Sequence, residues 1–301
     1  MTNVATLISA PTAVLDQDAA ETAQSVLPAD AQFRWLDVGI AAEILFSAAG
    51  QNDDAAIADR VRQALIGRPI DVVVQPLNTR RKRLLLADMD STMIGQECVD
   101  ELADFVGKKA HVAAITERAM RGDIDFAPAL IERVALLVGL PVTVIDRVIA
   151  ERITPTAGAR ALVATMRANG AHTCLVSGGF TLFTSQIAAM IGFDEARANT
   201  LVIDDDGRLT GQVANPILGR EAKLATLIEL RERLGLTRVE TLAVGDGAND
   251  LGMIKEAGLG VAYHAKPAVA AAAGARIDYS DLTALLYLQG YSGAEFVVRA
   301  S

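Results

Sequence analysis

The first 78 residues alternate between strand-like and helix-like patterns of apolar and polar positions. Short apolar or alternating runs of strand length occur at residues 4–9, 33–39, 42–47 and 70–77. Two runs with helical spacing lie between them, at residues 13–27 and 55–66. The order strand, helix, strand, strand, helix, strand predicts a small split-βαβ sandwich of α+β type over residues 1–80. We find no catalytic constellation in this segment.

The pattern changes at Leu84. The run 84–87 is wholly apolar, as expected for a central parallel strand covered on both faces. Similar runs end at residues 177, 245 and 263, and the clearest amphipathic helices between them are at 157–168 and 221–234. Strands that alternate with helices predict an α/β fold with a doubly wound parallel sheet over residues 84–301. Ligands bind such sheets at the carboxyl ends of the strands.

One connection is too long for a single crossover. Asp88 and Ser177 are separated by 89 positions, and residues 96–152 are almost wholly helical in pattern, with breaks near Gly122 and at residues 139–141. We therefore expect a helical cap inserted after the first strand. Residues 202–209 predict a β-hairpin around an Asp-Gly turn. Their three aspartates do not form a calcium-binding loop, because the closing glutamate of that motif is missing.

Composition and charge exclude several classes of protein. Hydrophobic residues make up 51% of the 301 residues, which is typical of a globular chain and excludes general disorder. The formal net charge of −9 and the 4% of aromatic residues argue against a nucleic-acid partner. The longest apolar stretch, 134–145, is too short to span a bilayer, and the N-terminus lacks the basic segment of a secretory signal. The sequence predicts a cytoplasmic protein with no membrane partner.

Acidic residues follow two of the predicted strands. Asp88 and Asp90 stand at i and i+2, so both side chains project to one side of an extended strand end. The glycine-rich loop 245–250 contributes Asp246 and Asp250. Four converging carboxylates favour a hard divalent cation with oxygen ligands, of which Mg²⁺ fits best. Three scattered histidines and two cysteines argue against zinc.

Two further features are weak individually. Ser177, Gly178 and Gly179 follow a strand and precede a helical run, and a hydroxyl with exposed N–H groups at such a place can bind an anion. Lys223 begins the predicted helix 221–234, where a single lysine is most often a surface residue. Their value comes from their order along the chain.

Taken in order, these motifs resemble those of the haloacid dehalogenase superfamily of phosphotransferases. The resemblance extends over residues 84 to about 290 and rests on the strings 88–92, 177–179 and 245–250 together with Lys223. With Glu97 and Arg133 added, the motifs are most similar to those of the phosphoserine phosphatases in that superfamily. The segment 1–80 resembles the ACT-type extension of many such enzymes, which would make it a regulatory domain.

The resemblance implies a function and a role for each residue. It implies Mg²⁺-dependent hydrolysis of a small phosphorylated amino acid, O-phospho-L-serine, as the last step of serine biosynthesis. Asp88 would be the nucleophile that forms an aspartyl-phosphate, and Asp90 the general acid and base. The remaining roles implied are metal binding by Asp88, Asp246 and the backbone carbonyl of Asp90, phosphoryl binding by Ser177, Gly178 and Lys223, substrate binding by Glu97, Arg133 and Asn249, and support of Lys223 or a metal-bound water by Asp250.

Three alternatives stay open at this point. A related enzyme could transfer the phosphoryl group to homoserine or act on phosphothreonine. A second interpretation makes the chain an amino-acid sensor that binds its ligand through residues 1–78, and the intact catalytic set argues against it. A non-enzymatic scaffold gives no reason for four converging carboxylates. The resemblance also predicts a homodimer joined through the N-terminal domain.

Overall fold

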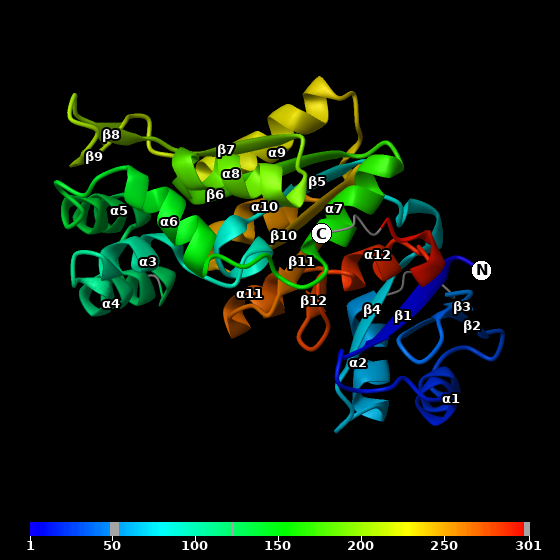
Figure 1. Cartoon of the computed structure of the whole chain (residues 1–301). Coiled ribbons are helices and arrows are strands. Elements are labelled where there is room, and N and C mark those ends of the chain that lie inside the picture. Colours follow the sequence, from blue (N-terminus) through cyan, green and yellow to red (C-terminus); the bar gives the residue numbers. More distant parts are fainter. Residues whose placement is uncertain (49–53, 122, 298–301) are drawn as a thin grey trace.

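A computed structural model describes residues 1–48, 54–121 and 123–297 of the chain. It shows a small antiparallel sheet packed beside a larger parallel sheet, with a helical layer at one end of the parallel sheet (Figure 1). No helix within the described ranges combines the length and the hydropathy that a membrane span requires.

The antiparallel sheet has four strands in the order β2-β3-β1-β4. They are β1 (Asn3–Ser9), β2 (Gln32–Asp37), β3 (Ala41–Phe46) and β4 (Ile70–Pro76). One face is covered by α1 (Gln17–Ser25) and α2 (Asp54–Ala64), whose apolar side chains share a buried cluster with Leu7 and Ile44. The element order predicted from the sequence is confirmed. The predicted start of α1 is wrong by four residues, because the Asp16 carboxylate accepts a hydrogen bond from the N–H of Ala19 (2.8 Å) and so caps the helix there.

The parallel sheet has six strands in the order β12-β11-β10-β5-β6-β7. They are β5 (Leu84–Ala87), β6 (His172–Phe180), β7 (Glu195–Asn199), β10 (Thr241–Gly245), β11 (Leu259–Tyr263) and β12 (Ala275–Ile277). The chain runs from β5 outward to β7 and then returns to β10 on the other side of β5. The doubly wound α/β fold is therefore confirmed. Its topological switch point lies between β5 and β10, where ligands of such sheets bind.

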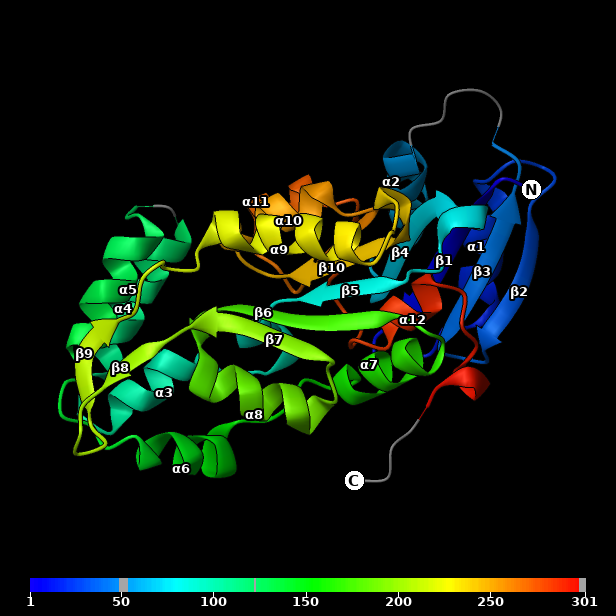
Figure 2. The same cartoon turned by 90° about the horizontal axis from the view of Figure 1, so that it is seen from above.

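Strand β5 shows why both faces of the sheet are covered. Leu85 and Ala87 share a buried cluster with α7 (Ala159–Ala168) and α8 (Thr181–Ile191). Leu84 and Leu86 point the other way, into a cluster with α9 (Arg220–Arg233) and α10 (Leu251–Glu256). Figure 2 shows these two pairs of helices on opposite sides of the sheet. The short helices α11 (Pro267–Ala272) and α12 (Ala284–Leu288) follow β11 and β12.

The predicted cap is present as four helices between β5 and β6. They are α3 (Cys98–Asp104), α4 (Lys109–Arg121), α5 (Phe126–Ala135) and α6 (Thr143–Arg152). The predicted hairpin consists of β8 (Leu201–Ile203) and β9 (Leu209–Val213), and its turn is closed by the Asp204 carboxylate, which accepts from the N–H of Arg208 (2.9 Å). The hairpin supports the cap, since the N–H of Gly139 donates to the carbonyl of Leu209 (2.8 Å).

The second face of the antiparallel sheet belongs to the core of the larger domain. Ile8 and Val73 lie in the same buried cluster as α12 and the β5 face toward α7. Asp71 on β4 strengthens this junction, because its buried carboxylate accepts from the backbone N–H groups of Asp278 (2.7 Å) and Ser280 (2.8 Å) in the loop after β12. The two sheets are therefore joined by apolar packing and by hydrogen bonds.

Replacing Asp71 tests this junction. Asp71→Ala leaves at least two backbone N–H groups of the 278–280 loop without an acceptor, so we expect the free energy of unfolding to fall by about 2–3 kcal/mol. Urea denaturation measures the change. Asp59→Ala is the control. Asp59 is 71% exposed, and within the described ranges its ion-pair partner is Arg62, a surface interaction worth less than about 1 kcal/mol. Equal losses in the two variants would contradict the assigned role of Asp71.

Candidate active site

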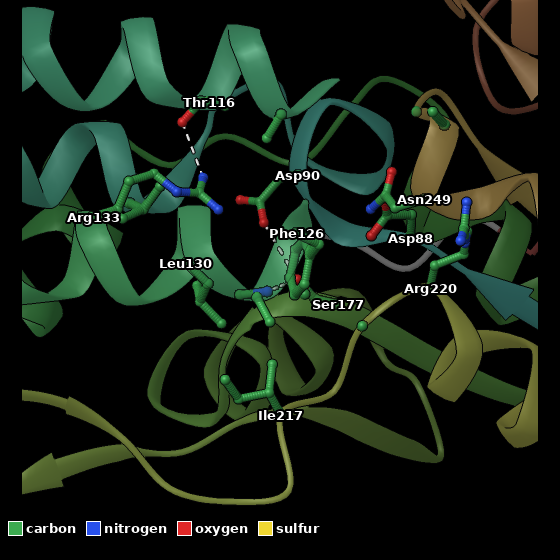
Figure 3. Close-up of a pocket in the computed structure, with 18 of the residues that line it drawn as sticks. Asp88, Asp90, Thr116, Phe126, Leu130, Arg133, Ser177, Ile217, Arg220 and Asn249 are labelled. Carbon is green, nitrogen blue, oxygen red and sulfur yellow. Dashed lines mark hydrogen bonds between the residues drawn. The ribbon is translucent and has the colours of Figure 1, made fainter. Parts of the chain in front are cut away.

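A cavity of about 650 Å³ opens at the carboxyl ends of β5, β6 and β10, under the helices of the cap (Figure 3). Eight of the residues singled out from the sequence line it: Asp88, Asp90, Glu97, Arg133, Ser177, Gly178, Asp246 and Asn249. The other two, Lys223 and Asp250, do not line the cavity and are fully buried. The structure thus brings most of the predicted residues into one space and places a lysine–aspartate pair behind its wall.

Asp88 occupies the first position after β5, where the chain leaves the sheet through an irregular turn, Met89–Met93. Its Oδ1 atom accepts a hydrogen bond from the backbone N–H of Met89 (2.7 Å). The same atom forms an ion pair with the ammonium of Lys223 (2.7 Å). Ser91 adopts a left-handed conformation (φ 54°), which turns the chain sharply from the sheet edge toward the cap. Asp88 is 6% exposed, so its carboxylate is held in one orientation with one edge toward the cavity.

Lys223 neutralises part of the acidic cluster from below. Its Nζ atom lies 2.7 Å from Oδ1 of Asp88 and 2.7 Å from Oδ1 of Asp250. Burial opposes the charged form of an amine, but the two carboxylates outweigh it and raise the pKa of Lys223 above its ordinary value. Asp250 is fixed in turn by the N–H of Gly247, which donates to its Oδ2 atom (3.1 Å). A β-carbon at Gly245 would lie 2.4 Å from the Asp250 carboxyl, so only glycine allows this approach.

Asp246 completes a group of three carboxylates. Its Oδ1 atom accepts from the hydroxyl of Thr92 (3.0 Å), and burial and the nearby Asp88 raise its pKa to about 6. One oxygen each from Asp88, Asp246 and Asp250 lie within 4.8 Å of one another. The ammonium of Lys223 offsets only one of three negative charges, so the all-oxygen donor set fits a hard divalent cation.

Asp90 projects into the cavity apart from that group. Its Oδ1 atom accepts from the N–H of Cys98 (2.9 Å), and its Oδ2 atom accepts from the hydroxyl of Ser177 (3.3 Å). The pKa of Asp90 is raised to about 6, mainly by burial and further by the charge of Asp88. The hydrogen bond from the Cys98 N–H lowers the pKa and only partly opposes these effects. A carboxyl group with this pKa exchanges a proton readily near neutral pH.

Two charged residues of the cap face the same cavity. Glu97 accepts from the hydroxyl of Ser91 (2.7 Å), and burial raises the pKa of Glu97 well above its ordinary value. Arg133 on α5 is buried, and its Nη1 atom donates to the hydroxyl of Thr116 (2.9 Å). Its Nη2 atom has no acceptor among the residues that the structure describes, and Figure 3 shows the guanidinium reaching toward Asp90. A carboxylate and a guanidinium at the cap side suit a ligand with an ammonium and a carboxylate group.

Sequence reasoning missed Phe126, the first residue of α5. Its ring lies so close to the loop after β6 that a β-carbon at Gly178 would be 2.7 Å from Cζ of Phe126. A β-carbon at Gly219 would be 3.3 Å from the same ring. Phe126 therefore forms the contact between the cap and two glycines of the core domain. In the sequence it is one apolar residue of an amphipathic helix, and nothing there distinguishes it from a core residue.

The comparisons with known proteins agree with this geometry. A family profile described as haloacid dehalogenase-like hydrolase matches residues 85–255. A phosphoserine phosphatase of Albidiferax ferrireducens is 46% identical over 217 residues, which cover 71% of this chain and 92% of that protein. The crystal structure of a HAD-family hydrolase from Salmonella enterica serovar Typhi has a TM-score of 0.84 and 30% identity, and covers 95% of this chain and 98% of its own. A structure titled as a phospho-aspartyl intermediate analogue of phosphoserine phosphatase has a TM-score of 0.65 and 39% identity, over 69% of this chain and 98% of that one.

Gly178→Ala tests the contact between the cap and the core domain. The added methyl group would collide with Phe126, so we expect the cap to sit away from the strand ends and kcat/KM for p-nitrophenyl phosphate to fall by about 10- to 100-fold. Gly274→Ala is the matched control, because the first atom that a β-carbon there would meet among the described residues, its chain neighbours aside, is the carbonyl oxygen of Gly260 at 3.8 Å. Steady-state kinetics compares the two, and a Gly178→Ala enzyme as active as the control would contradict the proposed contact.

Proposed function

Because the chain belongs to the haloacid dehalogenase-like hydrolases, we propose that it hydrolyses O-phospho-L-serine to L-serine and inorganic phosphate. One observation carries the proposal. A single cavity joins a buried Asp88–Lys223 pair at the strand ends to a carboxylate and a guanidinium, Glu97 and Arg133, on the cap. The first pair suits phosphoryl transfer, and the second suits the amino and carboxylate groups of an amino acid.

In the proposed first step, Asp88 attacks the phosphorus atom of the substrate. A bond forms between its carboxylate oxygen and phosphorus, and the bond from phosphorus to the serine oxygen breaks. Asp90 donates a proton to the leaving oxygen, which its raised pKa of about 6 allows. In the second step Asp90 takes a proton from water as the water attacks phosphorus, and the Asp88 carboxylate is released. The structure titled as a phospho-aspartyl analogue supports such an intermediate in a protein 39% identical to this chain.

The groups around Asp88 would stabilise the transferred phosphoryl group. We assign this role to the Ser177 hydroxyl and to the backbone N–H of Gly178. A bound Mg²⁺, held by Asp88, Asp246 and the backbone carbonyl of Asp90, would offset the charge repulsion between the attacking carboxylate and the phosphate. Lys223 contacts Asp88 from behind the cavity wall, so its main contribution would be to hold that carboxylate in a fixed orientation.

The cap would select the amino acid. Glu97 would accept hydrogen bonds from the substrate ammonium, and Arg133 would donate to its carboxylate through the Nη2 atom that has no acceptor in the described part of the protein. Asn249 lines the cavity beside Asp246 and would contact the substrate there. A substrate that lacks a carboxylate would leave the buried guanidinium of Arg133 unpaired, which penalises its binding.

The first test is phosphate release from L-phosphoserine in the presence of Mg²⁺. We expect release to cease with EDTA and to fall at least about 1,000-fold in Asp88→Asn, because the amide is not a nucleophile. Asp59→Asn, on the exposed surface of α2, serves as control. Adding homoserine and measuring phosphohomoserine separates hydrolysis from phosphoryl transfer. If a generic aryl phosphate is cleaved with the same dependence on Asp88 and phosphoserine is not, the proposed role of Asp88 is supported and the proposed substrate, phosphoserine, is wrong.

Arg133→Lys tests the substrate assignment. Lysine keeps the charge but loses the planar fork and the bond to Thr116, so we expect KM for phosphoserine to rise about 100-fold. The loss on p-nitrophenyl phosphate, which has no carboxylate, should be at least 10-fold smaller. Arg160→Lys, at an exposed position of α7, controls for the change of residue type. Equal losses on both substrates would show that Arg133 does not bind the carboxylate.

A further inference from the structure

Asn199 joins two backbone segments of the candidate site without touching the cavity. It ends strand β7 and is 2% exposed, and it is not among the residues that line the cavity. Its Nδ2 atom donates to the carbonyl of Gly178 (2.9 Å) and to the carbonyl of Leu218 (3.0 Å). Its Oδ1 atom accepts from the N–H of Leu218 (2.6 Å). The amide therefore uses both of its hydrogens and its oxygen on the main chain.

From this geometry we propose that Asn199 is a positioning residue for the phosphoryl-binding end of the cavity. The inference rests on the proposed phosphatase function and adds a residue to it. Asn199 would act by fixing the Gly178 backbone and the start of α9 relative to each other, rather than by contact with substrate.

The first segment needs an external anchor because Gly178 has no side chain. A glycine backbone has more conformational freedom than that of any other residue, so the orientation of its peptide must be imposed by neighbours. The Gly178 carbonyl is held by Asn199 (2.9 Å), a residue that does not line the cavity. The N–H of the same peptide group, that of Gly179, donates to the hydroxyl oxygen of Ser177 (2.8 Å). Asn199 thus sets the peptide plane that holds the Ser177 hydroxyl in place beside Asp90.

The second segment leads into the helix that carries Lys223. Leu218 directly precedes Gly219, the N-cap residue of α9, and both the N–H and the carbonyl of Leu218 are bonded to Asn199. Lys223, four residues after Gly219, forms an ion pair with Asp88. Asn199 therefore links the loop that holds Ser177 to the helix that orients the proposed nucleophile.

The contact with the cap gives independent evidence that these two segments work as a unit. The ring of Phe126 lies against Gly178, which is one end of the Asn199 bridge. It also lies against Gly219, which directly follows Leu218 at the other end. A shift between the segments would tilt the surface on which the cap rests. The residue type matters as well. Only an amide supplies two donors and an acceptor in this plane, because aspartate would direct an oxygen toward both carbonyls.

The test compares ligands that use different ends of the cavity, in the full-length enzyme with Mg²⁺. For Asn199→Ala and Asn199→Asp we expect the inhibition constant of orthovanadate, measured on p-nitrophenyl phosphate, to rise at least about 10-fold, and kcat to fall by about 10- to 100-fold. The inhibition constant of L-serine, which would bind Glu97 and Arg133, should stay within about twofold. Asn169→Ala is the control. Asn169 also donates to a backbone carbonyl, that of Thr165 (2.8 Å), but it is exposed at the end of α7.

Several outcomes would overturn the proposal. These are unchanged vanadate inhibition in a folded Asn199 variant, equal loss of vanadate and L-serine binding, or an equal effect in Asn169→Ala. Circular dichroism and thermal unfolding establish that each variant is folded. If Asn199→Ala does not fold, Asn199→Asp keeps the size and the Oδ1 acceptor and is judged by the same criteria. A wild-type enzyme that cleaves p-nitrophenyl phosphate but neither cleaves phosphoserine nor binds L-serine would reject the proposed substrate, while the vanadate measurement would still decide the role of Asn199.

Discussion

The ion pairs of Lys223 with Asp88 and Asp250 are the interaction around which the carboxyl edge of the sheet is organised. Lys223 and Asp250 are completely shielded from solvent, and Asp88 nearly so. Removing such groups from water costs several kcal/mol each, and only close pairing with good geometry offsets that cost. Two distances of 2.7 Å provide it. The fold must therefore bring the ends of β5 and β10 and the first turn of α9 to one point.

The sheet order meets this requirement in the simplest way. Because β5 and β10 are neighbours, Asp88 and Asp246 leave the sheet side by side, although 158 positions separate them in the sequence. The third acidic residue, Asp250, follows four residues after Asp246, and α9 crosses the same face of the sheet as α10. Three carboxylates with one ammonium leave an excess of negative charge, and the pKa of Asp246 rises to about 6 as a result of burial and of Asp88. The cluster is therefore compatible with the divalent cation proposed above.

Much of this arrangement could be predicted from the sequence, and the limits have physical causes. The apolar runs predicted the central strands and the helices. The side chains of Leu84 to Ala87, for example, alternate between the two buried clusters, as the side chains of a strand covered on both faces must. The acidic motifs predicted which carboxylates line the cavity, because residue type and strand-end position can both be recognised in the sequence. The position of Lys223 behind the cavity wall depends on how α9 packs on the sheet. Phe126 and Asn199 were missed because their partners, Gly178, Gly219 and Leu218, lie at least 19 positions away along the chain. Secondary-structure propensity does not distinguish such residues from ordinary residues of a helix or strand.

The N-terminal unit is joined to the larger unit by a shared apolar core and by buried hydrogen bonds. Ile8 and Val73 are part of the core that includes α12, and Asp71 holds the loop after β12. That loop continues the connection, because the carbonyl of Ser280 lies 2.9 Å from Nε2 of His264, and two residues beyond His264 the N–H of Lys266 donates to the carbonyl of Asp246 (3.3 Å). Deleting residues 1–80 would therefore expose an apolar face and remove support from the loop that carries an acidic residue of the site. A loss of activity in such a truncated protein would report on this support as much as on regulation, so the role of the N-terminal unit has to be examined in the intact chain.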